Sequence, residues 1–161
     1  MQTEGNRTLD LSNLCGQPMK NLPATNIESI KRLIGTKNCP GCNLSGANLV
    51  NADMRYSNLE NANLTGAQLN GADLTGARLS NTTLVGANLS GARLVTAELS
   101  QANLAGANLS NAKLNGARMI GANLSGASLT QTNLLGANLM SANLNSAKLR
   151  ATKMPDGKIS P

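Results

Sequence analysis

Residues 87–110 read ANLSGARLVTAELSQANLAGANLS, with a leucine at every fifth position. The same register holds without insertion over residues 42–156, which form 23 units with Leu at the centre of 20 and Met at the centre of three. Ala stands two positions before the centre in 18 units, and two positions after it stand Gly in 11 and Asn in four. The chain is therefore a repeat protein with a period of five residues.

A period of five matches no regular secondary structure, because one face of a helix repeats at about 3.6 residues and one face of a strand at about 2. Within a unit, however, the Ala and the Leu are two residues apart, so an extended segment points both to one side. The Gly or Asn that follows tolerates the positive φ that a corner often needs. Each unit is predicted to be a short extended segment and a corner, in coils that must stack to bury their leucines.

The unit Ala-Asn-Leu-Ser-Gly, seen in full at residues 87–91, resembles the repeat of the pentapeptide-repeat family. The resemblance extends over roughly 70% of the chain. It implies an all-β fold, a right-handed quadrilateral parallel β-helix with four units per coil, in which the centre and the small residue two before it face inward. The 23 units over residues 42–156 would then form almost six coils, with residues 157–161 as a tail.

Positions twenty residues apart should stack in this fold, which predicts what each face carries. Asn ladders are expected on two faces, and nearly all charges of the coils on the other two. Three pairs should be neighbours on adjacent coils: Asp73 and Arg93, Arg78 and Glu98, and Glu98 and Arg118. Four inward positions carry hydroxyls that are expected to donate to backbone carbonyls, namely Ser57, Thr82, Thr132 and Thr152.

Residues 1–41 precede the repeat and are predicted to form a loop and a short capping helix. Thr25 and Glu28 have the spacing of a capping box, and Gly35 suits the residue after a helix. Between them, apolar residues recur at helical spacing at Ile27, Ile30, Leu33 and Ile34. The pattern predicts an amphipathic helix over residues 26–34 that covers the leucines and strand edge of the first coil. Binding of a partner by this helix is the alternative.

Cys39-Pro40-Gly41-Cys42 joins this helix to the repeat and allows several interpretations. A thioredoxin-like redox pair would need a βαβ unit, which the pattern lacks, and a zinc site needs about four ligands, whereas the chain has three Cys and no His. A structural role remains, with the two cysteines reduced or joined as a local disulfide that fixes the cap. A regulatory thiol pair is the functional alternative, and Cys15 could bridge to either residue, so the connectivity stays open.

The net charge of +6 is concentrated towards the C-terminus, because residues 101–161 carry six Lys or Arg and one Asp or Glu. A small apolar set lies near these basic residues, and together they suit an acidic partner. The alternatives are a solubilising end and ordinary scattered aliphatic side chains. The predicted partner surface comprises Lys148, Arg150, Lys153, Ile120, Leu135 and Met140. The edge of the last coil around Met154 is a second candidate, for self-association or for docking of a partner.

The residues that catalysis needs are missing from the pattern. The chain has no His and no phosphate-binding loop, and its carboxylates show no paired arrangement. Nucleic-acid binding through basic and aromatic side chains is not expected with a single Tyr as the aromatic residue. No apolar run approaches the length of a membrane span. The sequence therefore predicts neither an enzyme nor a cofactor.

The predicted function is a non-catalytic structural or protein-interaction module with an unidentified protein partner. The alternative is a redox-responsive protein whose cysteine pair opens or closes the cap. Some pentapeptide-repeat proteins bind gyrase as DNA mimics, but those are strongly acidic, which disfavours this role for a basic chain. No signal peptide is visible, so a cytoplasmic location is the default. The cap is similar to that of cyanobacterial members, some of them periplasmic or in the thylakoid lumen, which is the alternative if a targeting segment was removed.

Overall fold

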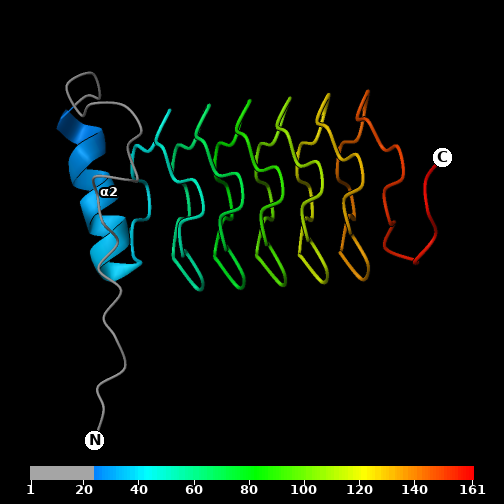
Figure 1. Ribbon diagram of the computed structural model, residues 1–161, viewed down its shortest axis with the longest axis horizontal. Helices are drawn as coiled ribbons and strands as arrows, with labels where there is room; N and C mark the ends of the chain where they lie inside the picture. Colours follow the sequence, from blue (N-terminus) through cyan, green and yellow to red (C-terminus); the bar gives the residue numbers. More distant parts are fainter. Residues whose placement is uncertain (1–23) are drawn as a thin grey trace, which may run out of the picture.

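The computed structural model describes residues 24–161, with side chains from residue 27 onward. A single described helix, α2 (Ala24–Thr36), lies across one end of a stack of coils. The coils advance along the long axis of the molecule, and the C-terminus lies at the far end (Figure 1). The described chain is a rod with a helix on its N-terminal end.

Successive coils pair through parallel bridges between residues twenty apart, from Asn38 with Asn58 to Asn133 with Lys153. Each bridge is isolated, so an extended segment contributes a single bridging residue to the sheet. The bridges fall in four rows, which we call walls 1 to 4. Their bridging residues are 43, 63, 83, 103, 123 and 143 in wall 1; 48 to 148 in wall 2; 53 to 153 in wall 3; and 38 to 138 in wall 4, always in steps of twenty.

Three backbone hydrogen bonds per wall hold adjacent coils together, one of them from the corner residue two after the centre, as Gly91 N donates to Ser110 O at 2.9 Å. The amide of a central residue donates to the next coil, as Leu89 N does to Asn108 O at 2.7 Å. The amide of the bridging residue donates to the preceding coil, as Asn88 N does to Ala67 O at 2.9 Å. A coil inside the stack therefore has partners on both sides, and the first and last coils each lack one.

The corners are tight turns with positive φ, as predicted from the Gly and Asn positions. The amide of Ala87 donates to Leu84 O at 3.0 Å across Val85 and Gly86, and φ of Gly86 is 62°. Positive φ at the third residue of such a turn is the mark of a type II turn. Positive φ recurs at every residue that lies two positions after a centre, from Gly46 to Ala151 and including Thr96. The repeat therefore imposes the corner even on a residue type that disfavours it.

The leucines form one continuous core, as predicted. Every central residue from Leu44 to Leu134 is buried, and so is the small residue two before it. Ile30 and Leu33 of α2 belong to the same apolar cluster. The central residues of the last coil are less covered: Leu139, Leu144, Leu149 and Met154 are half-buried.

Helix α2 is longer at both ends than the predicted range of 26–34. It begins at Ala24, so Thr25 lies inside the helix and not at its N-cap. At the other end Lys37 N donates to Leu33 O at 2.8 Å, and Lys37, with a φ of 53°, takes the left-handed position expected of Gly35. The sequence placed the C-terminal cap of the helix at Gly35 and not at Lys37, because side-chain contacts that no pattern marks support this end.

That support comes from the residues that follow the helix. Thr36 Oγ1 lies 2.8 Å from Arg32 O, to which it donates, and accepts a hydrogen bond from Asn38 N at 3.1 Å. Arg32 Nε also donates to Asn38 O at 3.1 Å. These contacts fix the turn from the helix into the first bridge, so no glycine is required there.

The inward hydroxyls were predicted correctly at three of four positions. Thr82, Thr132 and Thr152 donate to the backbone oxygens of Leu79, Leu109 and Leu129, at 2.6, 2.7 and 2.6 Å respectively. Ser57 is fully buried, and its Oγ has no hydrogen-bond partner within the described residues. The prediction was wrong there, because the Ser57 hydroxyl has no acceptor within hydrogen-bond distance among the described residues.

Ser57→Ala is expected to raise the free energy of unfolding by about 1 kcal/mol, since it removes a buried unpaired hydroxyl and restores the residue of most other units. Thr132→Ala is the matched control and should lower it by about 1 kcal/mol, because its hydroxyl is paired. Denaturant unfolding of both variants measures the difference. A loss of stability on Ser57→Ala would contradict the assignment of an unpaired group.

Candidate functional site

The described residues contain no arrangement suited to metal-dependent chemistry. Within residues 24–161, no three His, Cys, Asp or Glu side chains come close enough together to hold a metal ion. The one helix of this part of the chain lacks the length and the apolar character for crossing a membrane. The features that remain are the junction at the cap, the outer walls and the C-terminal end.

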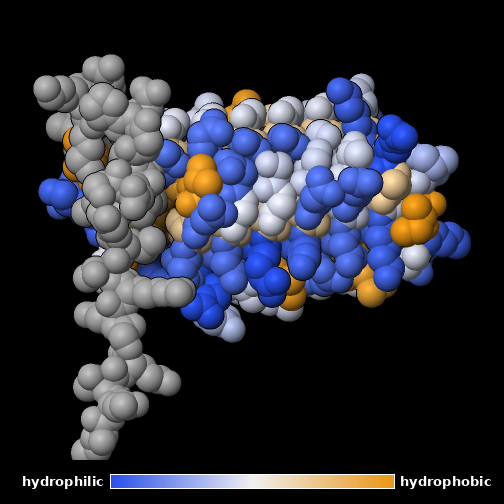
Figure 2. Space-filling view, viewed as in Figure 1, coloured by the Kyte–Doolittle hydropathy of each residue, from blue (hydrophilic) through white to orange (hydrophobic). Residues whose placement is uncertain are grey.

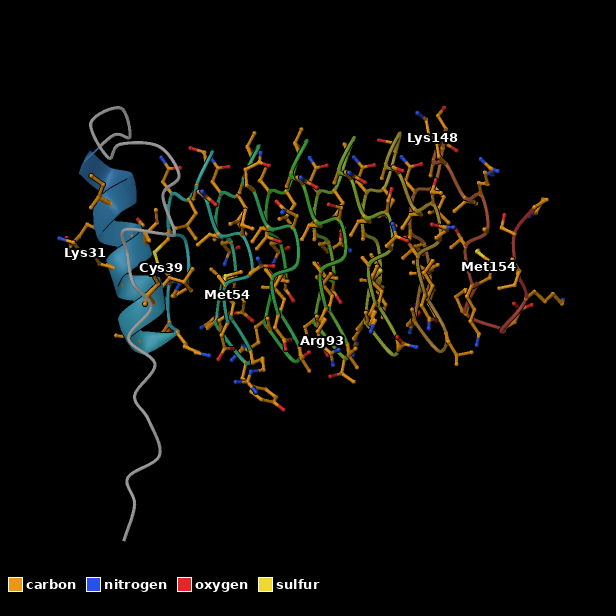
Figure 3. The ribbon with its side chains drawn as sticks, viewed as in Figure 1. Lys31, Cys39, Met54, Arg93, Lys148 and Met154 are labelled. Atoms are coloured by element: carbon orange, nitrogen blue, oxygen red, sulfur yellow. A yellow bond between two sulfur atoms is a disulfide. The ribbon has the colours of Figure 1, made fainter. Side chains whose placement is uncertain are left out.

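At the N-terminal junction, Cys39 and Cys42 are joined by a disulfide, with their Cα atoms 5.4 Å apart. Cys39 is fully buried, and its Sγ lies 3.3 Å from the backbone oxygen of Ser29 in α2. Its amide donates to Asn58 O of the next coil at 2.8 Å. The disulfide therefore lies between the helix and the coils, where Figure 3 labels Cys39. Cys15 lies outside the described residues.

Asn side chains line walls 1 and 2, where the predicted ladders are present. Asn143 Nδ2 donates to Asn123 Oδ1 at 3.3 Å, and Asn123 Nδ2 donates to Asn103 Oδ1 at 3.2 Å. The sequence did not predict that these side chains also accept a second hydrogen bond, from the backbone. Asn103 Oδ1 also accepts from the amide of Ala105 at 3.2 Å, and most Asn and Asp residues that bridge do the same two residues on. The bridging Asn thus stabilises its own corner as well as the stack.

Walls 3 and 4 carry the charges of the early coils, mostly in pairs. Asp73 lies 3.5 Å from Arg93, and Glu98 lies 3.9 Å from Arg118, as predicted for neighbours on adjacent coils. Arg78 bridges with Glu98 in the backbone, but its guanidinium turns to Glu60 at 2.7 Å instead. These pairs leave little unbalanced charge in the first half of the rod.

Asp53 is the most strongly perturbed of these groups. Hydrogen bonds from Arg55 hold the pKa of Asp53 well below its usual range, against the opposing effect of burial, and Lys37 acts in the same direction as Arg55. The Arg55 side chain lies 2.8 Å from Asp53 and the Lys37 ammonium 3.0 Å from it. Because these side chains are substantially exposed, the cluster is a surface feature near the cap with no sign of a reactive group.

The C-terminal end differs from the rest of the rod because the last coil has no coil after it. Among the described residues, the five amides of residues 137–150 that would donate to a further coil have no acceptor: those of Leu139, Ser141, Leu144, Ser146 and Leu149. The corresponding amide of the preceding coil, Leu124 N, donates to Asn143 O at 2.7 Å. We call residues 137–150 the open edge. It spans the ends of walls 4, 1 and 2.

Wall 3 of the last coil is closed by the tail. Lys153 and Ile159 form an antiparallel bridge. Met154 N donates to Lys158 O at 2.7 Å, Ser160 N donates to Thr152 O at 2.8 Å, and Ala151 N donates to Ser160 O at 3.0 Å. The prediction of an open edge around Met154 was wrong, since the tail folds back over that segment.

The predicted partner residues surround this end but do not form one continuous patch. Lys148 and Arg150 are exposed on wall 2, and Lys153 is half-buried on wall 3. Met140 is 65% exposed and stacks on Ile120 in wall 4, whereas Leu135 is 40% exposed on wall 3 beside Gly157 of the tail. Figure 2 shows apolar side chains among hydrophilic ones near this end, and Figure 3 labels Lys148 and Met154 there.

The similarity of this chain to known proteins covers the repeat. The family model for pentapeptide repeats matches residues 42–81, 82–119 and 117–154. A pentapeptide repeat protein, Rfr23 from the cyanobacterium Cyanothece 51142, has 35% sequence identity and a TM-score of 0.63, with 80% of this chain and 96% of that chain covered. These matches support the predicted right-handed β-helix. No curated protein sequence matches the chain.

Two further solved structures are similar at lower TM-scores. HetL, a pentapeptide repeat protein from Nostoc sp. PCC 7120 involved in regulation of heterocyst differentiation, has 35% identity and a TM-score of 0.48, with 76% of this chain and 66% of that chain covered. AT2G44920, from the thylakoid lumen of Arabidopsis thaliana, has 31% identity and a TM-score of 0.48, with 62% and 66% covered.

The contribution of Asp53 to stability is expected to depend on pH. Its pKa is depressed in the folded chain, so its contribution is present above the unfolded value of about 3.9 and is lost as the pH falls through the lower folded value. Asp53→Asn should therefore lower the melting temperature at pH 6 and lower it less at about pH 2. The effect should stay within about 1 kcal/mol, because the pair is exposed.

Thermal unfolding followed by circular dichroism at both pH values measures this difference. Glu28→Gln is the control, since Glu28 forms no salt bridge among the described residues. If Asp53→Asn lowers the melting temperature by the same amount at both pH values, the result would contradict a stabilising role of the ionised carboxylate.

Proposed function

The chain belongs to the pentapeptide-repeat family, and on this premise we propose that it is a non-catalytic scaffold that binds a protein partner at the C-terminal end of its β-helix. The observation that carries the proposal is the contrast between the ends of the rod. At the N-terminal coil, Ile30 and Leu33 of α2 cover the leucines. At the C-terminal coil, Leu139, Leu144 and Leu149 stay half-buried, and their backbone amides have no acceptor among the described residues. Unsatisfied edges of this kind readily accept another chain.

The fold proposed for this scaffold is a quadrilateral β-helix of almost six coils. Four rows of bridges with a spacing of twenty residues support four sides per coil. The 23 units, taken four to a coil, support the coil count. The regular walls then act as a rigid support that presents the C-terminal end.

The partner surface that we propose combines the open edge with the residues around it. Lys148, Arg150 and Lys153 supply positive charge, and none of the three forms a salt bridge among the described residues. Leu135 and Met140 supply exposed apolar area on walls 3 and 4, and Ile120 is half-buried on wall 4. Charged groups of this kind influence the rate and specificity of association more than its total energy.

The test is a quantitative pull-down from the native cell with the full chain as bait. The double variant Lys148→Glu, Arg150→Glu should lose its specific partner by about tenfold or more if the C-terminal surface binds it. Lys31→Glu, Lys113→Glu makes the same change in net charge at exposed positions away from that end, and it should keep the partner. Equal recovery by the two variants would contradict the proposed surface, and capture of no partner by the wild type would contradict the proposed function.

A second candidate, a redox-responsive cap, is favoured by the disulfide between Cys39 and Cys42. A disulfide also favours an oxidising compartment, the alternative to a cytoplasmic location. By chain entropy alone, a bond closing a loop of four residues stabilises by about 2 kcal/mol.

Reduction of Cys39–Cys42 is therefore expected to lower the free energy of unfolding by about 2 kcal/mol. Free-thiol counts with and without reductant, combined with denaturant unfolding, measure this effect. Cys15→Ala is the control and should leave the difference unchanged. A reversible change well above 2 kcal/mol would support opening of the cap, and no change would contradict a role for the bond.

The gyrase-binding interpretation gains no support from the charge distribution. A DNA mimic requires a negative surface, whereas the net charge here is +6. We therefore propose no role at gyrase.

A further inference from the structure

The open edge offers hydrogen-bonding groups in the pattern that a β-strand needs. On wall 1, the carbonyl of Ala142 and the amides of Leu144 and Ser146 follow one another along the edge without a partner among the described residues. In the preceding coil, the equivalent groups are all used: Leu124 N donates to Asn143 O at 2.7 Å, and Ala122 O accepts from Asn143 N at 2.9 Å. An extended chain laid on the edge would take the place of the missing next coil.

The molecule itself shows that an extended segment fits this edge. On wall 3 the tail forms three backbone hydrogen bonds with the last coil and an antiparallel bridge between Lys153 and Ile159. The bond from Ala151 N to Ser160 O lies at the corner where wall 2 meets wall 3. The remaining walls of the coil have the same backbone form, so they can accept a strand in the same way.

Side chains at the edge call for an apolar component in that strand. Leu139, Leu144 and Leu149 are half-buried, whereas the equivalent leucines of earlier coils are fully buried. A strand on the edge would point every second side chain inward over these leucines. Aliphatic residues at alternate positions would complete the core as another coil does.

The charge around the edge selects an acidic occupant. Residues 137–161 carry four Lys or Arg and one Asp or Glu, so their net charge is +3. A second copy docked end to end would bring an equally positive surface against this one, and the opposite end of a copy is covered by α2. A segment with carboxylates on its outward-facing positions has the complementary charge.

Resting on the proposed function, we propose that the open edge binds an extended acidic segment of another protein, with alternating aliphatic residues, as an added β-strand. One wall of the edge takes about five residues of such a segment, because each wall holds one five-residue unit and the alternation does not continue round a corner. Main-chain hydrogen bonds hold the strand, and the leucines and basic side chains select its sequence.

The probe is a fluorescent decapeptide of alternating Glu and Val, with a decapeptide of alternating Lys and Val as its control. Fluorescence anisotropy with the full chain should show binding of the acidic peptide that is weaker at high salt, and none of the basic one. Lys148→Glu, Arg150→Glu should weaken binding by about tenfold or more, whereas Lys31→Glu, Lys113→Glu should leave it unchanged. Equal binding of both peptides would overturn the proposal.

Hydrogen exchange locates the peptide without any substitution. Bound acidic peptide should slow the exchange of at least one of the edge amides of Leu139, Leu144 and Leu149 by tenfold or more, with little change at Leu89, inside the stack. Leu144→Pro removes an edge amide and should abolish the gain on wall 1, whereas Leu144→Ala keeps the amide and should retain most of it. Binding without protection of these amides would overturn the proposal.

Two other outcomes would also overturn the proposal of strand binding. Neither of them would contradict the proposed scaffold function. If no peptide binds and sedimentation velocity shows a dimer that Leu144→Pro dissociates, the occupant is a second copy of this chain. If no peptide binds and the chain stays monomeric, the edge binds no strand. In either case a partner captured in the charge-dependent pull-down would leave the proposed scaffold function intact.

Discussion

The constraint on which this structure depends is that a single five-residue unit can neither bury its leucine nor complete its backbone hydrogen bonds. Its single leucine needs the leucines of neighbouring coils to be buried, and its inter-coil hydrogen bonds need a coil on each side. The regular features of the molecule arise because the coil that lies twenty residues later along the chain supplies these partners. Everything irregular in the described part lies where a coil is missing. The two ends of the rod are therefore the places where a repeat protein of this kind can acquire individual features.

The two ends meet the constraint in different ways. At the first coil, α2 places Ile30 and Leu33 on the leucines, and the disulfide of Cys39 and Cys42 fixes the connection. At the last coil, the tail pairs with one wall and leaves the rest of the edge without partners among the described residues. Charge follows the same division, since acidic and basic side chains pair along the early coils and basic ones predominate at the C-terminal end. This asymmetry gives the rod a direction, with leucines covered by α2 at one end and half-buried leucines at the other.

The sequence predicted the features that repeat and the presence of a capping helix, but it missed details of both ends that no pattern marks. The stacking of residues twenty apart, the Asn ladders and the corners follow from columns of like residues, and each was present. The helix cap at Lys37 was missed because it depends on Thr36 and Arg32, which no pattern marks. The pairing of the tail was missed because a single antiparallel bridge at Ile159 has no periodicity. The open edge emerged only from the hydrogen bonds, since its residues have the same sequence pattern as those of every other coil.

Repeat architecture also relates this edge to stability. In a stack where each coil contacts only its neighbours, a terminal coil has one stabilising interface and an internal coil has two. The last coil should consequently open at a lower free energy than the coils beneath it, which makes it the region most able to adjust to an incoming strand. An added strand would supply the second interface, so that binding at this end and order in the last coil must rise together. The same backbone groups that build the rod are thus the ones that the proposed strand would use at its C-terminal end.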